Sequence, residues 1–208
     1  GFSEDGAAQN AKTLGINMSE VEAAALSHGH SDHTGGISKL GAMTGKKDVP
    51  FVVHPSAFKS PRYLKYSEEL KINFPKLTKK RIENAGFSLI ESDKPYHLLG
   101  ATILFLGEIP RITDFEKGFP IAHWQEDGKE VWDPIEDDTS IVMNLKDKGL
   151  VIVSGCAHAG IINTVKHAIE VTGIDKIHVV MGGFHLSGPL FEGIIDRTSE
   201  EMKNLKPD

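Results

Sequence analysis

The segment Leu26-Ser-His-Gly-His-Ser-Asp-His-Thr-Gly-Gly-Ile37 decides the fold, because it gathers three histidines and one aspartate within six residues. His28, His30, Asp32 and His33 form a His-x-His-x-Asp-His string. Imidazole nitrogens and carboxylate oxygens are ligands that suit zinc, manganese or iron. The string therefore predicts a metal site.

The spacing within the string predicts two metal positions. Side chains two residues apart in an extended segment point the same way, so His28 and His30 can hold one ion from the end of a strand. The chain then bends into a helix, so Asp32 and His33 would face a second, neighbouring ion. Asp32 is also placed to orient a nucleophile. The alternative, a solvated loop with incidental histidines, is disfavoured by the nearby glycines, which allow the tight backbone of a metal site.

The composition is typical of a soluble globular protein. The 208 residues suit one domain, with 39% hydrophobic and 25% charged residues. No apolar run approaches the length of a membrane span, and a formal net charge of -6 argues against capture of nucleic acid. The single Cys156 excludes an internal disulfide and suits a reducing compartment, so the cytoplasm is the expected location.

Both ends of the sequence predict a fragment of a larger fold. The chain starts without a methionine, in what is expected to be a loop, and it stops after a helix, where the alternation of strands and helices predicts another strand. We expect one α/β domain over residues 1–208 that is truncated at both ends.

Short apolar runs alternate with helical patterns along the chain. Strands are expected over residues 21–26 and 50–53, with a helix over residues 32–43 between them. From residue 85 to residue 111 the chain is rich in apolar runs with glycine breaks, which predict a small antiparallel sheet.

Two segments have no clean periodicity. Residues 58–80, rich in Lys, Arg, Tyr and Pro, are expected to be an insertion, which is either a lid, a basic surface for an anionic substrate, or a solvated surface excursion. Residues 112–136 carry many acidic and aromatic groups and are expected to form a loop over the site.

Two later strand ends each deliver a histidine. A strand ending near residue 154 leads to His158, and a strand ending near residue 183 leads to His185. Both histidines follow their strands as His28 follows its own, so both are predicted to join the metal site. His185 has two other readings, a substrate contact and a proton donor. Cys156 is left out of the predicted metal shell, because a lone cysteine after a buried strand is more often an apolar filler.

Two residues are candidates for substrate binding. His54 follows the strand over residues 50–53, and it either lines a substrate pocket or is a packing or surface histidine. Arg111 follows an apolar strand. Its guanidinium either clamps a phosphate or carboxylate, or forms a surface pair with a glutamate.

The histidine string at a strand end resembles the signature of the metallo-β-lactamase superfamily. The resemblance implies an αβ/βα sandwich, with His28 and His30 at one metal and Asp32 and His33 at the other. The segments LSHGHSDHTGG, FLGEIPR, SGCAHAGIINTVKHA and MGGFHL resemble, in this order, a branch of the superfamily that includes synthases acting on dihydropterins. In that branch the His158 and His185 blocks stand where other members carry a ligand histidine and a bridging aspartate, and a further histidine is expected after residue 208.

The sequence thus predicts an enzyme that uses one or two divalent metal ions, zinc foremost and manganese or iron as alternatives. The resemblance implies a small anionic substrate, phosphorylated or bearing a pyrophosphate, as in a dihydropterin synthase. Two alternatives stay open: a hydrolase of a phosphodiester, thioester or lactone that uses metal-bound water, and an inactive metal-binding module that senses a ligand. No nucleic acid or membrane partner is expected, and a homo-oligomer is left open.

Overall fold

The apolar run that precedes the histidine string forms part of a parallel sheet. In the computed structural model, which describes residues 3–208, the order of this sheet is β1-β2-β5. Its strands are β1 (Ala24–Ala25), β2 (Val49–Val53) and β5 (Phe87–Glu91). The central strand β2 is apolar and buried along most of its length, as expected for a strand covered on both faces. The predicted extended approach to the histidines is confirmed, although the paired part is only two residues long.

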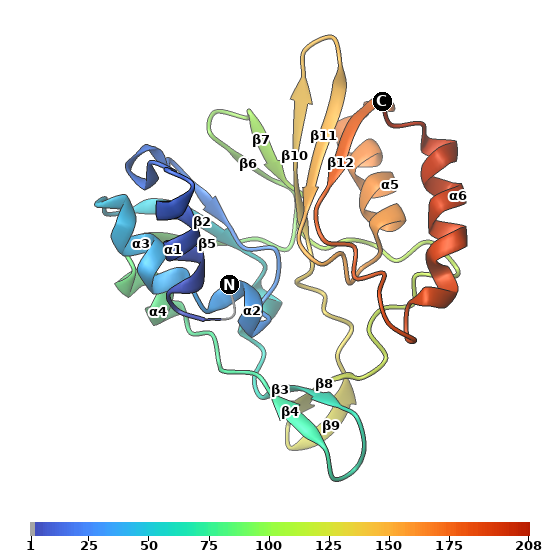
Figure 1. The fold of residues 1–208 in the computed structure, drawn as a ribbon, viewed down its shortest axis with the longest axis horizontal. Helices are drawn as coiled ribbons and strands as arrows, with labels where there is room; N and C mark the ends of the chain where they lie inside the picture. The colour runs from blue at the N-terminus through green and yellow to red at the C-terminus, as the bar shows by residue number, and fades with distance from the viewer. Residues whose placement is uncertain (1–2) are drawn as a thin grey trace.

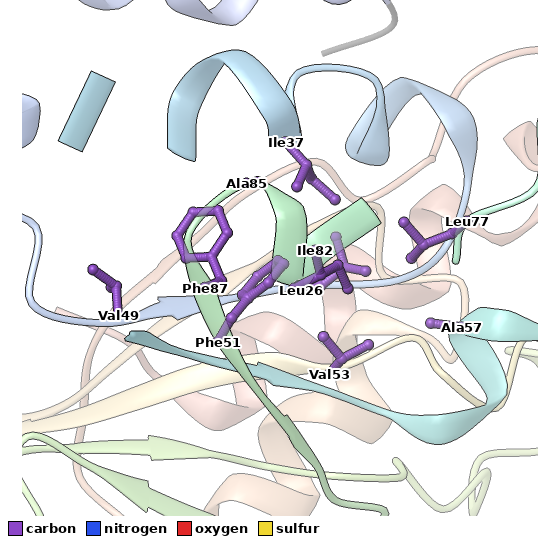
Figure 2. Close-up of a cluster of buried hydrophobic side chains, with 10 residues drawn as sticks. All are labelled: Leu26, Ile37, Val49, Phe51, Val53, Ala57, Leu77, Ile82, Ala85 and Phe87. Carbon is purple, nitrogen blue, oxygen red and sulfur yellow. The ribbon is translucent and has the colours of Figure 1, made fainter. Parts of the chain in front are cut away.

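Helices cover the outer face of the three-stranded sheet, at the left of Figure 1. They are α1 (Gly6–Thr13), α3 (Ile37–Thr44) and α4 (Lys79–Asn84). In Figure 2, Ile37 of α3 and Ile82 of α4 approach Phe51 and Phe87 of the sheet, and together they form one buried cluster. The predicted helix over residues 32–43 is broken at two glycines, so that α2 (Ser31–Thr34) is a separate turn.

A five-stranded sheet forms the second layer, in the order β12-β11-β10-β7-β6. Its strands are β6 (Tyr96–Leu98), β7 (Ile103–Phe105), β10 (Ser140–Leu145), β11 (Gly149–Ser154) and β12 (Ile177–Met181). The helices α5 (Ile161–Thr172) and α6 (Ile195–Leu205) pack on its outer face. The inner faces of the two sheets meet through Val52 and Phe105, which are fully buried in one cluster. The layer order is the predicted αβ/βα sandwich (Figure 1).

A third, four-stranded antiparallel sheet lies at the bottom of Figure 1, in the order β4-β3-β8-β9. Its strands are β3 (Arg62–Lys65), β4 (Lys71–Asn73), β8 (Ala122–Glu126) and β9 (Lys129–Trp132). The predicted loop over residues 112–136 is therefore wrong for the part that forms the β8–β9 hairpin. The sequence hid this hairpin because its pairing partner β3 comes from the expected insertion, far away in the chain.

The expected antiparallel sheet over residues 85–111 is also wrong in part. Strands β6 and β7 are antiparallel, but β5 runs parallel to β2 in the other sheet. The helix α4 between β2 and β5 explains the difference, because a helical crossover returns the chain in the same direction. Three short 3-10 helices complete the described part: η1 (Met18–Glu20), η2 (Pro55–Phe58) and η3 (Glu192–Ile194). Within residues 3–208, no helix has both the length and the apolar character needed to cross a membrane.

Gly41 in α3 allows this helix to approach the segment that leads into β5. A Cβ atom at this position would lie 2.2 Å from the carbonyl oxygen of Ala85 and 2.9 Å from the ring of Phe87. Backbone and a buried ring cannot move aside cheaply, so the close contact requires glycine.

We expect Gly41→Ala to lower the free energy of unfolding by about 1–3 kcal/mol, the usual cost of overpacking a core. Urea unfolding followed by circular dichroism measures this change. Gly193→Ala is the matched control, because a Cβ there meets no atom within 4 Å, and it should change stability by less than about 0.5 kcal/mol. Equal losses in both variants would contradict the packing described for α3.

Candidate metal centre

Three buried histidines meet where β1 and β11 end. The ring centroids of His28 and His30 are 4.6 Å apart, and His158 lies 4.8 Å from the first and 4.9 Å from the second. The exposed fraction of each side chain is 5% or less. Within the described part of the chain, the Nε2 atom of each ring is buried without a hydrogen-bond partner. The structure thus brings the predicted ligand His158 to the first pair of the histidine string.

The three rings are neutral at physiological pH. Burial lowers the pKa of His28 and of His158 well below the usual histidine value, and it lowers the pKa of His30 to about 4. A neutral ring can present an unshared electron pair on Nε2. Leaving three such atoms buried and unpaired is costly, and a tetrahedral ion such as zinc would satisfy all three. The donor set therefore fits the predicted divalent metal.

A second group of donor atoms lies beside the first. His33 Nε2 is 3.1 Å from Cys156 Sγ, and donor atoms of His28, His33 and Cys156 all lie within 4.8 Å of one another. The thiol is thus close enough to take part in a metal site, although the sequence favoured an apolar filler. Burial raises the pKa of Cys156 to about 12, so the metal-free thiol is protonated.

Asp32 lies at the edge of this second group. Its carboxylate is half exposed and lies 3.4 Å from His33 Nε2. The hydrogen bond from His33 lowers the pKa of Asp32 to about 2, so this carboxylate is ionised. The structure pairs Asp32 with His33, as the sequence predicted. It does not bring Asp32 into a cluster of three donor atoms among the described residues.

His185 contacts the centre through another histidine. Its Nδ1 is 3.1 Å from Nδ1 of His158, and its ring packs 4.8 Å from Phe119 and 4.7 Å from Phe191. If His158 presents Nε2 to a metal, its Nδ1–H donates to His185. A hydrogen bond of this kind fixes the orientation of a ligand ring. His185 is therefore placed to orient His158, and donor atoms of Cys156, His158 and His185 also lie within 4.8 Å of one another.

Ser27 orients two histidines at once, a role that the sequence analysis missed. Its hydroxyl oxygen is 3.3 Å from Nδ1 of His28 and 3.1 Å from Nδ1 of His33. The oxygen can accept a hydrogen bond from Nδ1–H of His28, which leaves His28 Nε2 free, whereas His33 Nε2 lies 3.1 Å from Cys156 Sγ. Gly155 makes room for this arrangement, because a Cβ there would lie 2.4 Å from the Ser27 hydroxyl.

A buried charge network holds the backbone of the histidine string. The Gly29 N–H donates to Asp137 Oδ2 at 2.6 Å, and Arg62 Nη1 donates to the same oxygen at 3.0 Å. Arg62 Nε lies 2.6 Å from Asp133 Oδ2. Burial alone would raise the pKa of Asp137, but the Arg62 guanidinium outweighs this and lowers it to about 2. An ionised carboxylate thus anchors the peptide between His28 and His30.

This network could not be predicted from local patterns in the sequence, because its members are far apart in the chain. Arg62 lies in the segment expected to be an insertion, and Asp133 lies in the segment expected to be a loop. One signal was available: Asp137 and Asp138 directly precede the buried strand β10. Two carboxylates at the start of a buried strand need partners, and the first finds Arg62.

The two predicted substrate-binding residues make other contacts in the structure. Arg111 Nη2 donates to the carbonyl oxygen of Pro134 and lies 3.5 Å from that of His158. His54 is buried, and its Nδ1 accepts a hydrogen bond from the Ser56 N–H at 3.2 Å. The arrangement of His54 matches the packing alternative, and Arg111 ties two backbone segments of the site together.

Comparisons with known proteins fit this geometry. No family model matches the chain. The chain is 37% identical to 7,8-dihydropterin-6-methyl-4-(β-D-ribofuranosyl)-aminobenzene-5'-phosphate synthase of Methanocaldococcus jannaschii. The 200 aligned residues cover 94% of this chain and 66% of the synthase. The chain is also 32% identical, over 197 residues, to the uncharacterized protein MJ0448 of the same organism, covering 88% of this chain and 67% of that one. The chain thus spans about two thirds of the length of these relatives.

A solved structure supports the fold. It is described as a metal-dependent hydrolase of the β-lactamase superfamily, and it matches with a TM-score of 0.72 over 97% of this chain and 70% of that one. At 23% identity this likeness shows the fold alone. The predicted α/β sandwich is confirmed. The prediction of an enzyme agrees with the name of the 37% identical relative, which is a synthase.

We expect Ser27→Ala to weaken zinc binding by about 10–100-fold, the usual effect of removing a group that orients metal ligands. Competition with a chromophoric chelator measures this affinity. Ser88→Ala is the matched control, because Ser88 is exposed on β5 and distant from the site in the chain. Unchanged zinc affinity in Ser27→Ala would contradict the role assigned to this hydroxyl.

The metal-free protein should lose stability as the pH falls from about 6.5 to about 4. A histidine whose pKa is lowered in the folded state binds its proton more readily when the chain is unfolded. Its contribution to the free energy of unfolding is therefore present above the unfolded pKa of about 6.5 and is lost as the pH falls below that value. His28, His30 and His158 all act in this direction. Asp138 opposes them, since burial raises its pKa to about 7. Urea unfolding at several pH values measures the net effect of the three histidines and Asp138 on the free energy of unfolding.

Asp138→Asn sharpens the same pH experiment. The variant lacks the opposing carboxyl group, so its loss of stability between about pH 6.5 and about pH 4 should be steeper than that of the parent protein. A free energy of unfolding that rises as the pH falls through this range would show that the three rings are not held neutral.

Proposed function

We propose that the chain, which has the metallo-β-lactamase fold, is a metal-dependent enzyme that joins a dihydropterin to a phosphorylated aminobenzene. The name of the 37% identical relative supports this substrate class, because its product unites a dihydropterin-6-methyl group with a ribofuranosylaminobenzene 5'-phosphate. The proposal concerns the intact protein, of which this chain supplies the metal-binding residues described above.

One observation carries the proposal: three buried imidazoles present free Nε2 atoms to one point. A protein with no metal would leave these atoms unsatisfied at a considerable energetic cost. An inactive sensor module could also keep such a site. The relative's synthase activity favours the enzyme.

The proposed cofactor is one or two divalent ions, zinc foremost and manganese or iron as alternatives. His28, His30 and His158 would hold the first ion, and His33 with Cys156 would stand beside it. When bound, such an ion withdraws charge from the oxygens of a phosphate or pyrophosphate group and eases its departure. The neutral state of the three rings supports this assignment, because a protonated imidazole cannot bind a metal.

The proposed reaction forms one bond and breaks another. The amino nitrogen of the aminobenzene bonds to the 6-methyl carbon of the dihydropterin, the bond from that carbon to a pyrophosphate oxygen breaks, and the nitrogen loses one proton. Asp32 is ionised and half exposed, so it is placed to orient the incoming N–H by accepting a hydrogen bond. The departing pyrophosphate takes up the proton, and His185 is proposed to hold the His158 ring in place by accepting its Nδ1–H.

Arg111 is proposed to act through the carbonyl groups of Pro134 and His158, which it holds at the site. We assign no substrate contact to His54, because its ring is buried and bonded to the Ser56 N–H. The single cysteine supports a cytoplasmic protein, and the 5'-phosphate in the name of the 37% identical relative supports a small anionic substrate.

Incubation of the metal-loaded protein with both substrates tests this function. The substrates are a dihydropterin-6-methyl pyrophosphate and a ribofuranosylaminobenzene 5'-phosphate, and mass spectrometry detects the coupled product. We expect His30→Ala to lower its rate of formation by about 100-fold or more, as for the loss of a group that stabilises developing charge. His97→Ala is the matched control, because His97 is exposed on β6. Release of pyrophosphate at the same rate with and without the aminobenzene would identify a hydrolase instead.

A further inference from the structure

We propose that the cavity beside His158 and His185 binds the benzene ring of the aminobenzene substrate, and that Lys117 at this cavity binds its phosphate. The inference rests on the proposed function and assigns one of the two substrates to a place in the structure. The cavity has a volume of about 460 Å³, within the usual range for small-molecule sites. Because two of the metal-site histidines line it, a ligand there adjoins the reacting groups.

Aromatic side chains form much of the cavity wall. Phe115, Trp132, Phe184 and Phe191 all line it. Phe191 is central, because its ring lies 4.7 Å from that of His185 and 5.3 Å from that of Phe119, which in turn stacks on His158. Aromatic rings attract one another at centroid distances of about 4.5–7 Å. A flat ring that enters the cavity would extend this row of rings toward the histidines.

The polar groups of the cavity favour a benzene ring over a pterin. A pterin carries several ring nitrogens, an amino group and a carbonyl, and each needs a partner when it is buried. The cavity's carboxylate, Glu116, is already used, because it accepts hydrogen bonds from the N–H groups of Ile162 at 2.9 Å and Asn163 at 2.8 Å. Each unpaired polar atom of a buried pterin would cost about 1–3 kcal/mol. A benzene ring has no such requirement.

Lys117 supplies the cavity with a positively charged group. Among the described lining residues it is the only lysine or arginine, and it is exposed, so its amine can reach a ligand. A phosphate on the ribose would pair with this amine. The amino group lies at the other end of the same substrate, so its nitrogen would point toward His158 and His185, which line the cavity. The dihydropterin would then approach from the side of Asp32 and His33.

Calorimetric titration of the zinc-loaded protein with 4-aminobenzylphosphonate tests the assignment. This probe carries the ring, the amine and a stable anionic group. We expect Phe191→Leu and Lys117→Gln each to weaken binding by about tenfold. Trp124→Leu is the matched control, because Trp124 packs under Lys59 on the small sheet and does not line the cavity, and it should leave affinity unchanged. Equal affinity in the parent and in both cavity variants would overturn the proposal, as would no detectable binding.

Two smaller probes keep the test independent of protein folding. Methylphosphonate lacks the ring and 4-methylaniline lacks the anion, so each should bind the parent protein at least about tenfold more weakly than the complete probe. If methylphosphonate binds as tightly as the complete probe, the ring makes no contact and the proposal fails.

Steady-state kinetics separates this inference from the proposed function. Phe191→Leu should raise KM for the aminobenzene substrate by about tenfold and leave KM for the dihydropterin pyrophosphate unchanged. The reverse result would place the pterin in the cavity, which overturns the inference and leaves the proposed function standing. If the parent protein couples no substrates but still loses probe affinity in Phe191→Leu, the proposed function fails and the ring-binding cavity stands.

Discussion

The structure depends on the burial of three neutral imidazoles at one point between two sheets. Burial keeps His28, His30 and His158 unprotonated, and it leaves their Nε2 atoms without partners among the described residues. A folded chain carries this cost only where something else satisfies the nitrogens. The sandwich supplies the geometry, because the end of β1 brings two of the rings and the end of β11 brings the third. The site therefore follows from the way in which the two layers meet.

The surroundings of the rings hold them in place by two separate means. The Ser27 hydroxyl lies within hydrogen-bond distance of Nδ1 of His28 and of His33, whereas Asp137 holds the backbone between His28 and His30. Arg62 pairs with Asp137 and belongs to β3, so the small third sheet is tied to the metal site through a buried ion pair. Removing one partner of such a pair would leave an uncompensated buried charge. The third sheet thus helps to hold the metal centre in place, and its ion pair with Asp137 contributes to the stability of the centre.

Local signals in the sequence were sufficient to single out His28, His30 and His158, and insufficient for Cys156 and for the groups that hold the three rings in place. The string from His28 to His33 is contiguous, and the strand that leads to His158 is a clear apolar run, so strand and ligand could be read together. Arg62 and Asp137 are 75 positions apart in the chain, so no local pattern in the sequence indicates that they form an ion pair. The same reason explains the missed pairing of β8 with β3, and the parallel placement of β5. Long-range pairing is decided by packing, which a single sequence shows only indirectly.

X-ray absorption spectroscopy at the zinc edge, on protein loaded with one equivalent of zinc, shows which side chains hold the metal. We expect a first shell with three imidazole nitrogens at about 2.0–2.1 Å, from the three rings whose Nε2 atoms are free. A first shell with at most one imidazole, or one dominated by sulfur at about 2.3 Å, would contradict this expectation.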